Sequence, residues 1–255
     1  MNKLILLALT GLLAAQTGHA QDFKLKLGSK ERKIVIDMQG SDVSVEGGDG
    51  DELVIRGNGF EEAPKRAEGL HPIYNSAVDN TKLGLSVTQQ DNAVRIVRAS
   101  RKDANYVIRV PRSASVQYSQ SGWNGGDIQV RDVTGDLELS VKSGDIKLTN
   151  VSGPVVANTI SGDIQVRFSP VAQGPSSIST VSGDVDVSMP TNTKATLKLR
   201  SISGEVYTDF DMSIGKNQDA LRHIGGQVVD GTINGGGTAV SLKTVSGDIY
   251  LRKAK

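Results

Sequence analysis

"GGDIQVRDV TGDLELSVK SGDIKLTNV SGPVVANTI SGDIQVRFS" runs from residue 125 to residue 169 and consists of five nine-residue blocks without a gap. The second position of every block is glycine, and the fourth and sixth positions are Ile, Leu, Val or Ala. Apolar residues two apart, with polar residues between them, predict a strand with one buried face. Glycine adopts backbone conformations that strain other residues, and neighbouring Ser and Asp stabilise turns. Each block is therefore predicted to be a short strand followed by a tight corner.

Two arrangements of these strands fit the blocks. In an antiparallel meander each strand pairs with the next, whereas in a coil of two strands per turn each pairs with the next but one. The first, third and fifth blocks resemble one another more than they resemble the second and fourth. The corner recurs downstream, so that the residues after its glycine fall at 163, 184, 205, 227 and 248, with spacings of 21, 21, 22 and 21. One constant corner and one variable corner explain this period, which favours the coil.

We therefore predict an all-β fold, a β-solenoid of stacked two-strand coils that repeat about every 4.8 Å. One set of apolar residues is expected to face inward. The inward set includes Ile128, Val130, Leu137, Leu139, Ile146, Leu148, Ile164, Val166, Val185, Val187, Ile249 and Leu251.

The region before the regular blocks keeps the strand pattern but loses the regular glycine. We expect residues 21–120 to form irregular coils or a cap, and residues 121–255 to form the regular solenoid. The stretch GSDVSVEG at 40–47 looks like a degraded copy of the corner. A long loop at 58–82 interrupts this region, and its EEAPKRAEG stretch is expected to hold one or two helical turns closed by Gly69. Loops of this length are typically functional or disordered.

The chain begins with the features of a secretory signal peptide. Lys3 precedes a 12-residue apolar run, and Gly18 and Ala20 suit a cut after residue 20. The run is shorter than the roughly 20 residues that cross a bilayer as a helix. The sequence therefore predicts an exported protein of the periplasm or cell surface, with no membrane span. Without Lys3, 28 basic and 28 acidic side chains remain, so net charge directs the protein to no particular partner, nucleic acid included.

Three stretches resemble a known family. The repeated SGDI corners, the VIRVP at 107–111 and the ending GGGTAVSLKTVSGDIYL are similar to the bacterial "putative adhesin" family of exported β-strand-repeat proteins, whose domain has no known function. GLHPIYNSAVDNT resembles one branch of it. Pro154, Lys142, Gly225 and Gln227 depart from the pattern, Lys142 by standing where an apolar residue is usual. The resemblance implies a β-solenoid and an envelope location, and implies no reaction.

Two rows of polar side chains should line up on the coils. Acidic residues follow the corner glycines and should stack one rung apart except where Gln227 intervenes; they are Asp127, Asp145, Asp163, Asp184, Glu205 and Asp248. Stacked like charges repel, so neighbouring donors, water or a bridging cation such as calcium must satisfy them. Because the glycine-rich calcium motif is incomplete and Asp commonly bonds its own turn, turn capping is favoured and no metal site is predicted.

The second row consists of hydroxyl residues just before each corner. We expect it to face outward, where flat hydroxyl rows can bind ice or sugar but are more often simple strand-forming surface residues. Its members are Thr159 and Ser161, Thr180 and Ser182, Ser201 and Ser203, and Thr244 and Ser246.

A basic group precedes the regular coils and has one nearby acid, Asp103. Its members are Arg95, Arg98, Arg101, Lys102, Arg109 and Arg112. It could contact an anionic envelope polymer, but a solvated strand face is the more common explanation. His71 and His223 have no cysteine partners, which argues against zinc. GGG at 235–237 lacks the Lys and Ser/Thr of a phosphate loop and is predicted to be a turn.

No catalytic motif is present, so we predict no catalytic, cofactor-binding or metal-binding residues and no cofactor. The favoured hypothesis is a non-enzymatic, adhesin-like binding or scaffold protein of the envelope, with an envelope polysaccharide or a surface protein as partner. Carbohydrate-active β-helix enzymes are the main alternative, for which the long loop offers Glu61, Glu62, Glu68 and Asp79. A third alternative is a structural element that self-associates through open solenoid ends.

Overall fold

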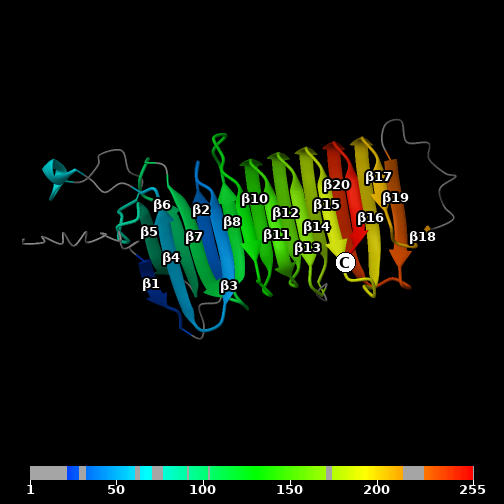
Figure 1. Cartoon of the computed structure of the whole chain (residues 1–255), viewed down its shortest axis with the longest axis horizontal. Helices are drawn as coiled ribbons and strands as arrows, with labels where there is room; N and C mark the ends of the chain where they lie inside the picture. The colour runs from blue at the N-terminus through cyan, green and yellow to red at the C-terminus, as the bar shows by residue number, and fades with distance from the viewer. Residues whose placement is uncertain are drawn as a thin grey trace, which may run out of the picture.

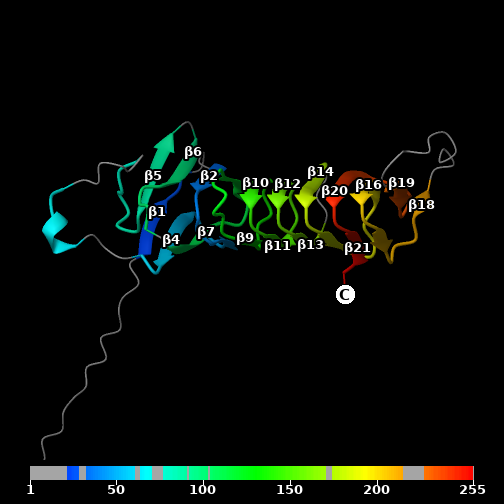
Figure 2. The ribbon, with the colours of Figure 1, turned by 90° about the horizontal axis from the view of Figure 1, so that it is seen from above.

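The computed structural model describes residues 22–28, 33–60, 64–70, 77–90, 92–102, 104–170, 174–214 and 227–254. Two long sheets face each other along one axis, and their strands lie across that axis like rungs (Figure 1). Seen from above, the sheets form two layers joined by corners (Figure 2). The predicted signal peptide, Glu61 and Glu62 of the long loop, His71 and His223 lie outside the described residues. Glu68, the third glutamate of that loop, is described and directly follows the 3-10 helix at Lys65–Ala67.

Sheet A has ten strands and sheet B has eleven. In spatial order, sheet A consists of β1 (Asp22–Lys26), β4 (Glu52–Asn58), β7 (Asn105–Pro111), β3 (Val43–Gly48), β9 (Ile128–Arg131), β11 (Ile146–Val151), β13 (Ile164–Phe168), β15 (Val185–Met189), β21 (Ile249–Lys253) and β17 (Val206–Thr208). Sheet B consists of β5 (Leu85–Gln90), β6 (Ala93–Arg98), β2 (Lys33–Met38), β8 (Ser115–Gln120), β10 (Leu137–Ser143), β12 (Val155–Ser161), β14 (Ser176–Ser182), β20 (Thr238–Ser246), β16 (Ala195–Ser203), β19 (Gln227–Ile233) and β18 (Ser213–Ile214).

The regular blocks form the predicted coil. β10 pairs with β12 and β11 with β13, both in parallel, so each strand contacts the next but one in the chain. All twelve residues of the predicted inward set are buried, with at most 1% of any one exposed. The β-solenoid of two-strand coils is therefore confirmed, and its core is a continuous stack of Ile, Val and Leu between the sheets.

The order of the coils differs from the predicted sequential stack at the C-terminal end. β20 lies between β14 and β16, and β21 lies between β15 and β17. The last coil is thus inserted inside the stack, and the C-terminus lies away from its end (Figure 1). The predicted corner at Gln227 is wrong, because Gln227 begins β19, which pairs antiparallel with β16. Equal spacing of a corner motif measures the length of a coil and carries no information about which neighbour it contacts.

The same insertion occurs near the N-terminus. β2 lies between β6 and β8, and β3 lies between β7 and β9, all in parallel. Antiparallel strands cover the stack beyond these coils, β5 on sheet B and β4 with β1 on sheet A. In the long loop, a 3-10 helix spans Lys65–Ala67 and Gly69 adopts a positive φ of 78°, as the helical-turn prediction required.

Candidate binding face

The corners place one acidic side chain on each of seven successive rungs, at the edge where sheet B turns into sheet A. These side chains form an acidic row, which in spatial order consists of Asp42, Asp127, Asp145, Asp163, Asp184, Asp248 and Glu205. The aspartate Oδ1 of each rung accepts the backbone N–H of the acidic residue on the next rung, at 2.7–2.9 Å. The predicted capping of each residue's own turn is therefore corrected, since the carboxylates join successive coils. Asp42 confirms that GSDVSVEG is a copy of the corner.

This bonding offsets the repulsion between the stacked carboxylates. Backbone N–H groups of the neighbouring rung satisfy one oxygen of each aspartate. Among the described residues, no group of three or more His, Asp or Glu side chains is arranged to hold a metal ion.

Replacing Asp163 with Ala should destabilise the protein by about 1–2 kcal/mol, because the N–H of Asp184 loses its acceptor. Asp163→Asn retains an acceptor oxygen and should recover most of that loss. Urea denaturation followed by circular dichroism measures both variants. Equal destabilisation by Ala and Asn would contradict the bonding between rungs.

The predicted outward hydroxyl row is half wrong. Thr159, Thr180, Ser201 and Thr244 are buried, with at most 4% of each exposed, and only the serines next to the corners face solvent. The buried hydroxyls donate to corner carbonyls, for example Thr180 Oγ1 to Gly162 O at 3.1 Å and Ser201 Oγ to Gly247 O at 2.9 Å. At Gly162, Gly183 and Gly247 a positive φ interrupts the inside–outside alternation between the two strands that the corner joins, so counting backwards from Ile164 through Gly162 assigns the wrong face.

Thr180→Val should cost about 1 kcal/mol, because the carbonyl of Gly162 loses the hydroxyl that donates to it inside the stack. The neighbouring Val181→Thr exchanges the same two side chains on the outer surface, where 47% of Val181 is exposed, and should change stability by less than about 0.5 kcal/mol. Chemical denaturation of the pair checks this difference. A larger loss for Val181→Thr would show that the faces are reversed.

Because the hydroxyls point inward, the residues between them point outward. We call Ile160, Val181, Val245 and Ile202 the aliphatic row, and 40–47% of each side chain is exposed. Strand register places them side by side on β12, β14, β20 and β16. With Val156 and Ile214, sheet B carries six of the ten large hydrophobic side chains that are exposed in the described residues. Contiguous apolar patches of this kind typically mark interaction sites.

Cations border the aliphatic row on the same face. Arg200 and Lys243 are directly opposite each other on β16 and β20, and both are exposed. Like charges directly opposite each other on neighbouring strands are destabilising. Within the described residues neither side chain forms an ion pair. An anionic group on a partner would relieve this repulsion.

A groove of about 860 Å³ lies beside the cations on the same outer surface. Its floor consists of small residues of sheet B, including Ser177, Thr196 and Ala239, and its two sides are formed by Val156 and Ile214. The Ser241 hydroxyl is buried at this groove and has no hydrogen-bond partner among the described residues. The C-terminal half of sheet B is therefore concave, largely apolar and cationic at one side.

The outer face of sheet A has a different character, because many of its charges are paired. Glu46 contacts both Arg109 and Arg131, and Arg252 contacts Asp186 at 3.0 Å. Tyr207 and Tyr250 stack with ring centroids 5.3 Å apart. The Tyr250 hydroxyl donates to Asp248 at 3.0 Å, and this hydrogen bond raises the pKa of the Tyr250 hydroxyl.

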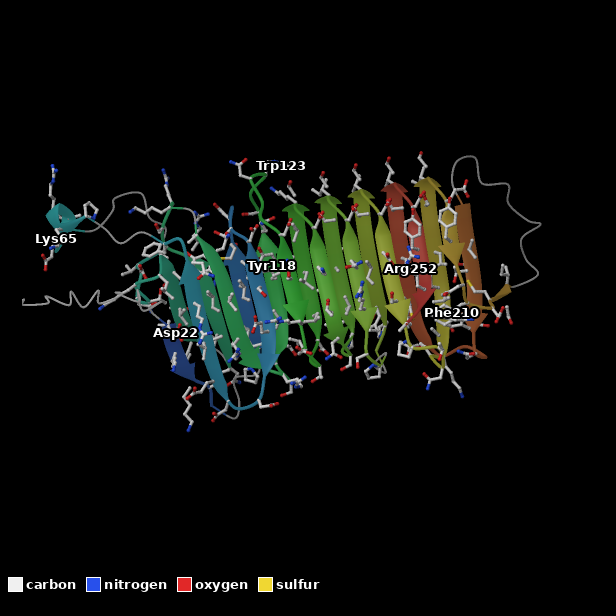
Figure 3. All side chains as sticks on the ribbon, in the orientation of Figure 1. Asp22, Lys65, Tyr118, Trp123, Phe210 and Arg252 are labelled. Carbon is white, nitrogen blue, oxygen red and sulfur yellow. The ribbon has the colours of Figure 1, made fainter. Side chains whose placement is uncertain are left out.

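Trp123 provides a further exposed ring at the corner edge. It lies on a loop that projects from the strand ends, whereas Arg252 and Phe210 lie together in the C-terminal half (Figure 3). Lys142, on β10 beside Ile160, places its ammonium 5.6 Å from the centre of the Trp123 ring. Lys142 thus occupies the position on β10 that the aliphatic residues occupy on the neighbouring strands. This position lies on the outer surface, where a lysine is tolerated in place of the usual apolar residue.

The other predicted candidates do not form a site. The basic group is divided, because Arg95 lies on sheet B beside Asp37 and Arg109 lies on sheet A beside Glu46. Asp79 accepts hydrogen bonds from the backbone N–H groups of Thr81, Lys82 and Gly84, so it holds its own loop together. The glycines at 235–237 form a turn between β19 and β20, as predicted.

One family model matches the solenoid part of the chain. Residues 123–252 match the model of a family described as Toastrack DUF4097. A structure from Clostridium sporogenes described as "a putative cell adhesion protein" is 11% identical, with a TM-score of 0.42, and the match covers 91% of this chain and 99% of the other. A structure from Bacteroides fragilis described as "a putative adhesin" is 14% identical, with a TM-score of 0.37, over 91% and 96% of the two chains. No curated protein matches the chain.

Proposed function

This chain belongs to the Toastrack family DUF4097, and we propose that it is a non-enzymatic, exported protein of the cell envelope that binds a partner through the outer face of sheet B. The observation that carries the proposal is the gathering of exposed aliphatic side chains on that one face. Its partner is a surface protein rather than an envelope polysaccharide. Aliphatic rows pack well against protein side chains and offer no aromatic face on which a sugar ring could stack.

The sequence supports export of the protein and different roles for its N-terminal and C-terminal regions. The basic start, apolar run and small residues of positions 1–20 support removal of a signal peptide and an envelope location, in the periplasm or at the surface. None of the described residues forms a helix long and apolar enough to cross a membrane. Residues 21–120 provide irregular coils and a cap at one end of the stack, and residues 121–255 present the binding face.

The alternatives have weaker support. For a carbohydrate-active enzyme, Asp79 would have to serve in catalysis, yet its two carboxylate oxygens accept backbone hydrogen bonds within its loop. For end-to-end assembly, parallel edges would have to be open, yet β1, β4 and β5 cover one end of the stack and β18 and β19 cover sheet B at the other. Turnover of a polysaccharide, or filaments by electron microscopy, would support these alternatives.

Capture of envelope components by the immobilised protein tests the proposal. The double variant Val181→Glu/Val245→Glu should capture at least about tenfold less of its partner than the native protein, because it places two carboxylates in the aliphatic row. The control Gln129→Glu/Gln165→Glu makes the same charge change on sheet A and should retain capture. Repeating the capture with a calcium chelator tests whether the acidic row binds calcium. The amount captured should not change. Equal capture by the two variants would move the binding site away from sheet B.

A further inference from the structure

We propose that the groove on the outer face of sheet B binds a long-chain fatty acid, with the carboxylate between Arg200 and Lys243 and the hydrocarbon chain along the groove floor. This inference goes beyond the proposed function, because the groove is separate from the aliphatic row, none of whose four residues lines it. A fatty acid requires an apolar channel for its chain and cations for its carboxylate. The groove and its border provide both.

The groove has the size and the lining that a hydrocarbon chain requires. Its volume of about 860 Å³ lies within the range of about 300–1,000 Å³ that is typical of ligand pockets. Small side chains form its floor, and none of the described residues that line it is aromatic. A sugar ring would lack an aromatic face on which to stack, whereas a chain gains from any apolar surface that removes it from water. The lining therefore favours a chain.

The length of the groove also suits a single chain. Strand order places β16, β19 and β18 after β20, so Ser241 on β20 and Ile214 on β18 are three strand spacings apart, or about 14 Å. In a bilayer, hydrocarbon chains extend over about half of the 30 Å core, or roughly 15 Å. A chain that begins at Ser241 therefore reaches Ile214 and passes over Thr196 and Gly231, which line the groove between them.

Three cations surround the Ser241 hydroxyl, where this path begins. Lys198 lies directly opposite Ser241 on β16. Lys243 lies two residues after Ser241 on β20, and Arg200 lies opposite Lys243. Asp230 faces Lys198 from β19 and offsets its charge, so Arg200 and Lys243 leave this border of the groove positive. Within the described residues neither of the two forms an ion pair.

The Ser241 hydroxyl is the second observation that points to a head group. Its oxygen is buried at the groove and has no hydrogen-bond partner among the described residues. Leaving a buried hydroxyl unpaired is unfavourable, and native structures rarely do so. A carboxylate that accepts from Ser241 and from both cations satisfies the hydroxyl. It also relieves the repulsion between Arg200 and Lys243 across their two strands.

Isothermal titration calorimetry of the purified protein with decanoate, laurate and myristate, each below its micelle concentration, tests this inference. Each added methylene should raise the affinity about two- to fourfold, where fourfold corresponds to complete burial. Dodecyltrimethylammonium has the chain length of laurate and the opposite charge. It should bind at least about 10-fold more weakly than laurate, because it meets Arg200 and Lys243 instead of a carboxylate partner.

Two pairs of variants separate the chain from the head group. Ala239→Trp fills the groove floor from an exposed position and should lower the affinity for laurate at least about 10-fold, whereas Gln129→Trp adds the same side chain on sheet A and should not change it. Arg200→Gln/Lys243→Gln should lower the affinity about 10-fold and remove most of its dependence on salt. The control Lys147→Gln/Arg167→Gln removes two exposed cations from sheet A and should leave the affinity unchanged.

Ser241→Ala distinguishes binding from a structural role of this hydroxyl. The urea midpoint of the free protein should stay the same or rise, because the lost hydroxyl has no partner in the described residues. The affinity for laurate should nevertheless fall about 3- to 10-fold. A lower urea midpoint with unchanged affinity would contradict the assignment of Ser241 to the head group.

The outcomes that overturn the inference are specific. Equal binding of laurate and dodecyltrimethylammonium, no binding of laurate, or equal affinities of Ala239→Trp and Gln129→Trp would each exclude a fatty-acid site in the groove. Sedimentation with phosphatidylglycerol vesicles should leave the protein in solution, and binding to vesicles without binding of laurate would assign the face to a bilayer. Val181→Glu/Val245→Glu should bind laurate like the native protein, and Ala239→Trp should still capture envelope components, so either proposal can fail without the other.

Discussion

Ending the chain at Gly237, which removes β20 and β21, is expected to unfold the C-terminal half of the protein. In a sequentially stacked solenoid the same truncation would remove only an end coil. Here β20 bonds β14 on one side and β16 on the other, and β21 bonds β15 and β17 in the same way. The truncation therefore opens a gap inside both sheets and separates the coil of β16 and β17 from the remainder of the stack.

The expected loss of folding free energy is large enough to unfold this half of the protein. Val240, Leu242, Ile249 and Leu251 are each at most 1% exposed, and burying one such side chain contributes about 1.5–3 kcal/mol. Four of them amount to about 6–12 kcal/mol, comparable to the whole stability of a typical domain, which is about 5–15 kcal/mol. Amide hydrogen exchange measures the result, and protection should disappear from β16 and β17 as well as from the removed strands.

Removing the edge strand β1 provides the control. β1 pairs only with β4, and its pattern of exposed and partly buried residues contributes little to the core. Its removal should leave protection in the regular coils intact. If the truncated chain kept native protection in β16 and β17, the insertion of the last coil would be wrong.

The regular coils could be predicted from sequence because their period depends on local chemistry. A strand with one buried face and a corner that needs glycine repeat together, so the inward residues from Ile128 to Val187 were identified correctly. The order of the coils could not be predicted, since the corner at Ser246 has the same sequence as the corner at Ser161 although its coil lies inside the stack. Which coil contacts which depends on the packing of the whole chain.

The binding face was missed for a related reason. Alternation continued backwards from Val185 would place Thr180 outward, but the positive φ of Gly183 interrupts it. A usable signal was nevertheless present. TIS, TVS, SIS and TVS each place an aliphatic residue between two hydroxyl residues at the same offset from the corner. Four aliphatic residues between inward hydroxyl residues and corner serines must face solvent, and the acidic residues beside them mark the edge of the same patch.

Gly162→Val is expected to destabilise the protein by about 3–5 kcal/mol, because two separate costs act at this corner. Gly162 has a φ of 140°, which residues with a side chain adopt only with strain of about 1–3 kcal/mol. A Cβ at this position would also stand 2.2 Å from the carbonyl oxygen of Gly144 on the neighbouring rung. The obstacle is backbone rather than a flexible side chain, so relief requires moving the rungs apart, which breaks the bond between Asp163 and Asp145.

Gly122→Val is the matched control, because its φ is not positive and no atom lies closer than 3.9 Å to the added Cβ. That variant should stay within about 0.5 kcal/mol of the native protein. Urea denaturation of Gly162→Val and Gly122→Val, followed by circular dichroism, compares the two, and Gly162→Ala should lie close to Gly162→Val because the clash begins at Cβ. A Gly162→Ala variant as stable as the native protein would mean that adjacent corners are not in direct backbone contact. The stacking that places the acidic and aliphatic rows at one-strand intervals would then lose its structural basis.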